Sequence, residues 1–215
     1  MEIRTFVASG FAENAYLIWN PGSHDAIAID PGDAPSIIQT LGQEDLQLAA
    51  IVLTHSHLDH IDGVAHLFRA TAAPIYLHPE ARLFYDNAAV QGAQFGMRVE
   101  APPPPTHELQ AGQTLDIAGI QLEVRYVPGH APGHVLLYNT ANNVAFVGDV
   151  VFQGSIGRTD LPGGNYQLLM NSIRDQVMTL PEETKLYSGH GPVTTVGQER
   201  RFNPFIAPMF GGSLA

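Results

Sequence analysis

Short runs of apolar residues, each closed by a polar turn, recur along the whole chain. Runs of this length between Gly, Pro, Asn and Asp residues are typical of buried strands. They cover residues 3–7, 15–19, 26–29, 48–53, 75–77, 114–117, 121–127, 135–138, 144–147 and 185–188. The second-half runs are separated by short turns at 118–119 and 139–143, which predicts two hairpins. The pattern therefore predicts a protein built largely from strands.

Apolar residues at helical spacing lie between some of these strands. The ranges with this spacing are 35–41, 61–70 and 166–180. A further range, 79–99, predicts a helix broken at Gly92 and Gly96. The four prolines at 102–105 exclude a helix or a central strand and predict an exposed connector. Strands in two groups with helices outside them favour two packed sheets in a layered α/β arrangement.

The composition is that of a globular protein with one large core. The 215 residues are 45% hydrophobic and 14% charged, and no linker or low-complexity segment divides them. We therefore expect a single domain over residues 1–215. The chain contains no cysteine, which excludes a disulfide, a thiol nucleophile and Cys-ligated zinc.

The charge balance limits the classes of partner. Ten Lys and Arg residues stand against 21 Asp and Glu, for a net charge of −11, and Lys185 is the only lysine. Phosphate backbones and anionic membranes need clustered cations, so neither nucleic acid nor a membrane is an expected partner. A small anionic substrate would need a local arginine. Residues 1–5 begin no signal peptide, and no apolar run could span a bilayer, so we expect a cytoplasmic protein. The pattern leaves the oligomeric state open.

Three histidines and an aspartate follow the predicted strand 48–53 within six residues. They are His55, His57, Asp59 and His60. Histidine is the commonest metal ligand at neutral pH, and burying so many polar groups without partners would cost several kcal/mol. Alternate residues of extended backbone point to the same side, so His55 and His57 can reach one ion. Asp59 and His60 are offset from them and can serve a second.

Further potential ligands follow other predicted strands. They are His130 and His134 after 121–127, Asp149 after 144–147, and His190 after 185–188. Polar residues at several strand ends that meet at one edge of a sheet form the expected active site of an α/β protein. Asp30 also ends a strand, and there we expect a turn or a hydrogen bond to a ligand.

The series His55-x-His57-x-Asp59-His60, then His134, Asp149 and His190, resembles the metallo-β-lactamase superfamily of hydrolases over nearly the whole chain. The resemblance implies a four-layer αββα sandwich, with two mixed sheets flanked by helices and a two-metal site at one edge. It implies that His55, His57 and His134 hold one ion, that Asp59, His60 and His190 hold the other, and that Asp149 bridges them. Asp59 and Asp149 would thus be catalytic carboxylates. His130 matches a histidine often seen ahead of the third ligand that is not itself a ligand.

Nitrogen and oxygen ligands without cysteine suit zinc, and iron and manganese also fit. Two divalent ions bridged by hydroxide supply a nucleophile near neutral pH and polarise a carbonyl. This predicts hydrolysis of an activated acyl bond. A thioester suits such a site, because a thiol with a pKa of about 8.5 leaves without help from a general acid.

The segments 154–164 and 188–192 resemble the glyoxalase II-like hydrolases, especially the short bacterial type. Glyoxalase II cleaves S-D-lactoylglutathione to D-lactate and glutathione. The resemblance places Arg158 near the glutathione moiety and makes it the expected substrate contact. The longer enzymes carry a C-terminal helical domain that binds glutathione. Here only residues 191–215 follow His190, and Arg200 and Arg201 are the cations available to replace that domain.

Two other functions fit the same motif. A mononuclear iron persulfide dioxygenase would need only His55, His57, His134 and Asp149. A lactonase or β-lactamase would use the same two-metal site on another acyl bond. The complete second ligand set favours a binuclear thioesterase over the dioxygenase.

Overall fold

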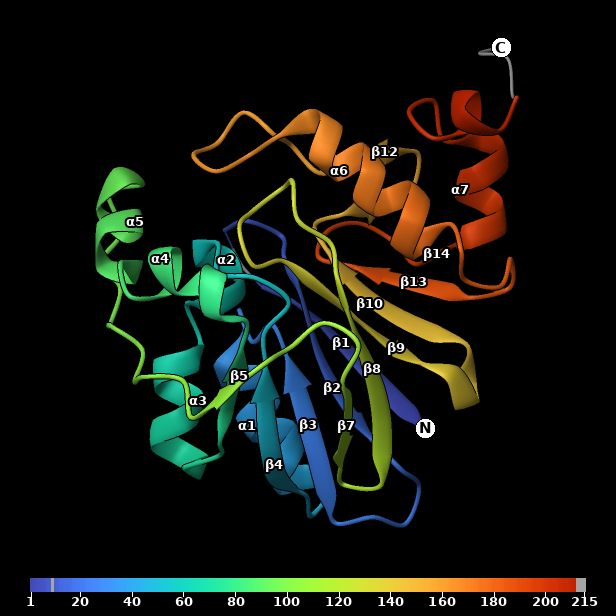
Figure 1. Cartoon of the computed structure of the whole chain (residues 1–215). Helices are drawn as coiled ribbons and strands as arrows, with labels where there is room; N and C mark the ends of the chain where they lie inside the picture. The colour runs from blue at the N-terminus through green and yellow to red at the C-terminus, as the bar shows by residue number, and fades with distance from the viewer. Residues whose placement is uncertain (9, 212–215) are drawn as a thin grey trace.

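Two six-stranded sheets pack against each other in the computed structural model, which describes residues 1–8 and 10–211 (Figure 1). The first sheet has the order β1 (Glu2–Val7), β2 (Asn14–Trp19), β3 (Asp25–Ile29), β4 (Gln47–Val52), β5 (Ile75–Leu77) and β6 (His107–Glu108). The second has the order β14 (Thr194–Thr195), β13 (Lys185–Ser188), β10 (Val144–Gly148), β9 (Val135–Asn139), β8 (Ile120–Tyr126) and β7 (Thr114–Ile117). Both are mixed: β3 to β6 pair in parallel, as do β10 and β13, and the other pairs are antiparallel. The hairpin β11 (Val151–Phe152) and β12 (Ser155–Ile156) stands apart.

Alternation along the central strands explains how the sheets pack. In β2, Tyr16 and Ile18 face the second sheet, whereas Ala15 and Leu17 face the opposite way. Both sets are buried, because successive side chains of a strand point to opposite faces and each face here is covered. Tyr16 meets Phe146 of β10 with ring centroids 5.2 Å apart. The apolar runs in the sequence are continuous for this reason.

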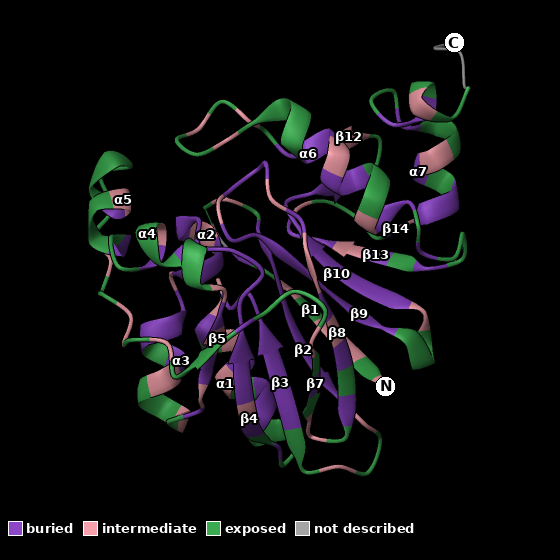
Figure 2. Cartoon of the chain, in the orientation of Figure 1, coloured by how far each residue is buried: buried purple, intermediate pink, exposed green. Residues whose placement is uncertain are grey.

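Helices cover the outer faces of both sheets. The first sheet packs against α1 (Ala34–Gln43), α2 (Leu58–Ile61) and α3 (Val64–Thr71). The second packs against α6 (Tyr166–Ser172), its π-helical continuation Ile173–Val177, and α7 (Val196–Phe202). Figure 2 shows the buried strands in purple between helices with exposed outer surfaces. The predicted αββα sandwich is thereby confirmed.

The predicted helix over 79–99 is shorter and interrupted. A 3₁₀ turn at Pro79–Ala81 leads into α4 (Arg82–Tyr85), which is followed by α5 (Ala88–Gln94). The interruption lies at residues 86–87 and not at Gly92, which is inside α5, where a Cβ atom would collide with Val99. The two helices stand at the left edge of Figure 1, beside α2. The proline run at 102–105 contains no helix or strand, as predicted.

Two further 3₁₀ turns, Thr140–Asn142 and Ala207–Phe210, complete the elements. Within the described residues, no helix has the length and hydrophobicity needed to cross a membrane.

Candidate metal centre

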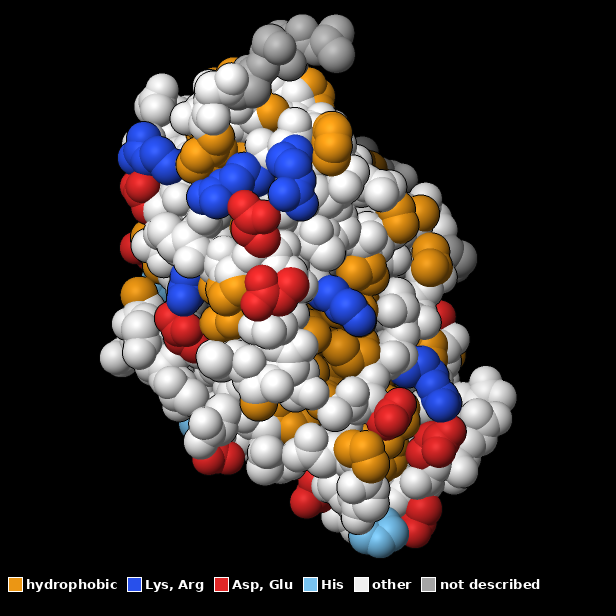
Figure 3. All heavy atoms as spheres, turned by 90° about the vertical axis from the view of Figure 1, so that its right-hand side faces the viewer, with side chains coloured by type: hydrophobic (Ala, Val, Ile, Leu, Met, Phe, Trp, Pro, Cys, Tyr) orange, Lys and Arg blue, Asp and Glu red, His pale blue; other side chains and the backbone are white. Residues whose placement is uncertain are grey.

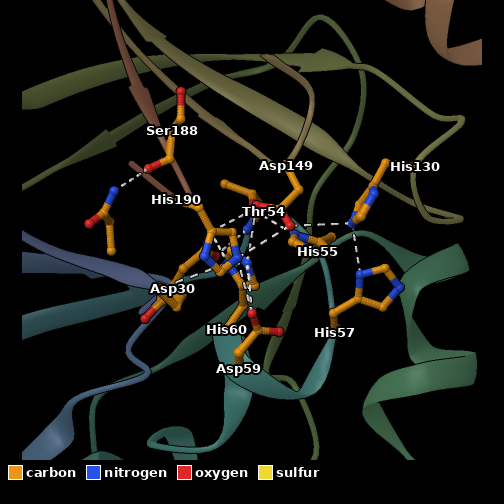
Figure 4. Close-up of polar contacts among 12 residues, drawn as sticks. Asp30, Thr54, His55, His57, Asp59, His60, His130, Asp149, Ser188 and His190 are labelled. Atoms are coloured by element: carbon orange, nitrogen blue, oxygen red, sulfur yellow. Dashed lines mark hydrogen bonds and ion pairs between the residues drawn. The ribbon is translucent and has the colours of Figure 1, made fainter. Parts of the chain in front are cut away.

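Loops at one end of the paired sheets bring the predicted ligands together (Figure 4). The turn after β4 carries His55 and His57, and α2 carries Asp59 and His60. The loop between β8 and β9 carries His130 and His134. Asp149 follows β10, and His190 follows β13. Each of these side chains therefore follows a strand end, and Asp59 and His60 lie on the helix that comes next, as the sequence predicted.

Asp59, His60 and His190 form one group of donors whose ligand atoms lie within 4.8 Å of one another. His190 Nε2 lies 3.1 Å from Asp59 Oδ2, and His60 Nε2 lies 3.9 Å from the same oxygen. This is the set that the resemblance assigned to the second ion. Its three members come from α2 and from the far end of β13, which are 130 residues apart in the chain.

His55, His57 and His130 form the first donor group, within the same distance limit, and Asp59, His60 and His190 are the second donor group. Here the geometry differs from the predicted set, which contained His134 in place of His130. His130 Nε2 shares a hydrogen bond with His57 Nδ1 at 2.8 Å. His134 lies behind His55 with the two rings stacked at 4.5 Å, and its Nε2 accepts a hydrogen bond from the Asp149 amide at 3.1 Å. All four rings therefore border the same space.

Asp149 lies between the two groups. Its Oδ1 faces His60 Nε2 at 3.3 Å, while its Oδ2 is 3.6 Å from His190 Nε2 and 3.5 Å from His130 Nε2. A carboxylate has two oxygens and can therefore serve two neighbours at once, which an imidazole nitrogen cannot. This position fits the bridging role predicted for Asp149.

Several of these buried atoms have no hydrogen-bond partner. They are Nε2 of His55, Nε2 of His57, Nε2 of His60 and Oδ1 of Asp149. A buried polar atom without a partner costs on the order of 1–3 kcal/mol, and here four of them lie around one space. Divalent ions would accept electron pairs from all of them. The residues present therefore fit a metal centre.

Burial sets the protonation of the imidazoles. It lowers the pKa of His57 to about 3, and it lowers the pKa values of His55 and His134 well below the usual range. These rings are therefore neutral at pH 7, the form in which nitrogen can bind a metal. His60 differs: burial opposes its charge, but the neighbouring carboxylates of Asp149 and Asp30 raise its pKa well above the usual range. The second donor group therefore has more negatively charged surroundings than the first.

Asp30 supports His60, a member of the second donor group. Its carboxylate accepts hydrogen bonds from the Thr54 amide at 2.7 Å and from His60 Nδ1 at 3.0 Å. The second bond leaves Nε2 of His60 directed into the site, which is how carboxylates orient metal-binding histidines. The contact agrees with the hydrogen bond to a ligand expected for this residue. Asp30 has a φ of 47°, a strained value for a residue other than glycine.

Glu13 was not recognised in the sequence. Its side chain is fully buried, and Oε1 lies 3.8 Å from Nδ1 of His60. Burial raises its pKa well above the usual value. A lone glutamate before an apolar run carries no motif, and only the fold brings it behind α2. The neighbouring Asn14 holds the segment around His190, since its side chain donates to the carbonyl oxygens of Ser188 and Gly191.

A cleft of about 470 Å³ opens over the donors. Its floor includes His57, Asp59, Asp149 and His190, and α4 and α5 form one side. Arg158 lies at its rim, where the guanidinium forms two hydrogen bonds of 2.7 and 2.8 Å with Asp160. The structure thus places Arg158 beside the site, as predicted, but already paired.

Comparison with known proteins agrees with this geometry. The family described as the metallo-beta-lactamase superfamily matches residues 8–190. The chain belongs to the metallo-β-lactamase superfamily. The hydroxyacylglutathione hydrolase GloC of Haemophilus influenzae is 38% identical over 96% of this chain and 98% of its own length.

Two solved structures are also similar. BLEG-1 B3 metallo-beta-lactamase is 39% identical with a TM-score of 0.90, covering 95% of this chain and 99% of its own. TTHA1623 in a di-iron-bound form is 40% identical with a TM-score of 0.85, covering 94% and 99%. The superfamily therefore extends to proteins named for different reactions, and the metal and the substrate of this chain need separate arguments.

Proposed function

We propose that the chain is a binuclear metal-dependent hydrolase of acyl thioesters, and that S-D-lactoylglutathione is the first substrate to test. The observation that carries this proposal is the second donor group. Asp59, His60 and His190 stand complete beside the histidine group, with Asp149 between them. A mononuclear oxygenase has no need of this second group. The similarity to the hydrolase GloC supports the same reaction class.

We assign one ion to His55, His57 and His134 and a second to Asp59, His60 and His190, with Asp149 shared. Zinc suits these ligands, and the di-iron form of a similar protein makes iron the main competitor. Bound ions of this kind lower the pKa of water to about 7 and polarise a carbonyl group.

The residues of the chain provide the rest. Asp149 and Asp59 hold negative charge at the centre of the site, since the nearby imidazoles keep both carboxyl pKa values below the usual range despite burial. Asp30 and Thr54 fix the α2 turn that carries His60. A substrate bound in the cleft would lie over these groups, and Arg158 at the rim is the cleft-lining cation among the described residues that could meet a substrate carboxylate. The thiol leaves as a thiolate and needs no proton from the protein.

The decisive experiment combines metal analysis with turnover on one preparation. The protein would be assayed with S-D-lactoylglutathione, a lactone and a β-lactam, and its zinc, iron and manganese would be counted. We expect close to two ions per chain and fastest turnover of the thioester. One iron per chain with oxygen consumption on a persulfide would instead identify a dioxygenase. Faster turnover of the lactone or the β-lactam would show that the substrate is not a thioester.

A further inference from the structure

The cleft has an apolar side wall that the thioesterase chemistry does not require. We infer that this wall, formed by α4 and α5, selects thioesters whose thiol part is apolar and carries little charge. The inference rests on the proposed function, since it names the substrate class of that same site.

Three large apolar side chains of the wall are exposed. Leu83, Val90 and Phe95 are 66%, 58% and 59% exposed, and all three line the cleft over the metal centre. Single exposed apolar residues are common on protein surfaces, but several that converge on one catalytic cleft indicate contact with a ligand. Phe11 from the β1–β2 loop extends this apolar surface, because its ring packs edge-to-face on Phe95 with the ring centroids 5.2 Å apart.

The wall is continuous with the chemistry. The ring of Phe84 on α4 contacts the ring of His57 with centroids 5.5 Å apart. The side chain of Gln91 on α5 donates hydrogen bonds to the carbonyl oxygens of Ser56 at 3.0 Å and Phe84 at 2.9 Å. These bonds tie α5 to the turn that carries His55 and His57. The wall is therefore held at a fixed position relative to the donors.

The position of the donors at the floor of the cleft indicates which part of a thioester would contact the wall. The reacting carbonyl has to lie over the donors at the floor, and in the proposal the acyl group stays there with it. The thiol part then extends outward through the rest of the cleft, along α4 and α5. An apolar thiol part would cover Leu83 and Val90 and remove them from water.

Charge recognition in the cleft is sparse by comparison. Among the described residues that line it, Arg158 is the only Arg or Lys, and both of its hydrogen bonds go to Asp160. Glutathione carries two carboxylates and one ammonium group. A glutathione thioester would have to compete with Asp160 for the one cation and would leave the apolar wall largely uncovered. This favours a thiol of lower charge.

The test compares D-lactoyl thioesters of three thiols: glutathione, N-acetylcysteamine, which is small and neutral, and benzyl mercaptan, which is apolar. For the metal-loaded protein we expect kcat/KM for the benzyl thioester to exceed that for the N-acetylcysteamine thioester by about tenfold, the effect of burying one additional apolar group. The double variant Leu83→Ser, Val90→Ser should lose this advantage, so that its kcat/KM for the benzyl thioester falls to near its value for the N-acetylcysteamine thioester. Equal rates on the two thioesters, or an unchanged double variant, would overturn the inference.

Phe202→Ser is the matched control. Phe202 is 67% exposed on α7, which lies on the opposite side of the molecule from α4 and α5 (Figure 1). Figure 3 looks onto that side, where charged side chains of both signs alternate with apolar ones. We expect this variant to hydrolyse all three thioesters at the parental rates.

Binding keeps the two proposals separable. If the metal-loaded protein hydrolysed none of the thioesters, the proposed function would fail, and calorimetry with the benzyl thioether analogue of the substrate would still test the wall. We expect about tenfold weaker binding to the double variant than to the parent. Sedimentation at several protein concentrations tests whether a second copy of the chain covers the wall instead. A dimer that the two serine substitutions abolish would show that it does, and the inference would be wrong.

Discussion

The carboxylate of Asp149 and the imidazole of His60 face each other at 3.3 Å in the interior, with no hydrogen bond to occupy the facing atoms. His60 lies on α2, which follows β4 of the first sheet, whereas Asp149 directly follows β10 of the second sheet. The contact therefore joins the two halves of the sandwich across the site. A bound ion would be held by both sheets, so its affinity depends on how the sheets pack as well as on the ligands.

Asp149→Ala tests the bridging role. The change removes the group that faces both donor sets. We therefore expect the metal content to fall below one ion per chain and kcat/KM to fall by roughly a hundredfold or more. This loss is larger than is usual for a residue that only orients a metal ligand. Metal analysis and thioester turnover on the same sample measure both. Normal activity in this variant would remove Asp149 from the centre. Asp175→Ala, at an exposed ion pair with Arg174, is the control and should leave both quantities unchanged.

His134 and His130 compete for one position in the first donor set. The family resemblance assigns the position to His134, whereas the geometry groups His130 with His55 and His57. We expect His134→Ala to lose about one ion per chain and His130→Ala to retain two, because His134 stacks directly on His55 and a bound ion would replace the hydrogen bond that its Nε2 accepts from the Asp149 amide. The reverse pattern of metal loss would make His130 the ligand.

Asp30→Asn tests the support behind His60. The amide can no longer accept both the Thr54 amide and the His60 Nδ1 proton as a charged group does, so His60 loses its fixed orientation. Loss of such a partner typically weakens metal affinity by about 10- to 100-fold. Titration with a competing chelator measures this, and circular dichroism checks that the fold is intact. Retained affinity would show that Thr54 and the α2 backbone alone hold His60.

The candidate metal ligands can be predicted from the sequence because each follows an apolar run. His55, Asp149 and His190 end strands of two sheets, and a sheet edge gathers whatever its strands end in. The residues that support or surround them were less visible. Glu13 and the wall residues Leu83 and Val90 reach the site through contacts between distant segments, which local pattern does not encode. Arg158 and Asp160 are only two residues apart in the chain, but both side chains are exposed, and sequence pattern does not show whether two exposed side chains pair.

Asp160→Asn tests that pairing. Arg158 lowers the pKa of the Asp160 carboxyl group to about 2, so the pair stays charged at every practical assay pH and acid cannot release the arginine. The amide would release it, and we expect KM for S-D-lactoylglutathione to fall by a fewfold with little change in kcat. The neutral N-acetylcysteamine thioester should be unaffected. The exposed position explains the modest size of the effect, since ion pairs in water are weak. Asp160→Glu should restore the parental KM, and an unchanged KM in Asp160→Asn would mean that Arg158 does not contact substrate.

Gly189→Ala tests how closely the backbone after β13 approaches the donors. A Cβ atom at this position would collide with Oδ1 of Asp149 and with the ring of His60. The backbone of Gly189 needs no left-handed conformation, so lack of space is the only penalty. We expect the two donor groups to be forced apart, with loss of metal and of activity, while the chain still folds.

Gly42→Ala is the matched control for that change. Gly42 lies near the end of α1 with open space around its Cα, so alanine there should stabilise the protein by about 0.5–1 kcal/mol through its higher helix propensity. Thermal denaturation should therefore show a small rise in Tm for Gly42→Ala, and the metal content should remain at the parental value. If Gly189→Ala also kept its full metal content, the donors would have more freedom than their packing indicates, and the close approach of β13 would not be part of what shapes the site.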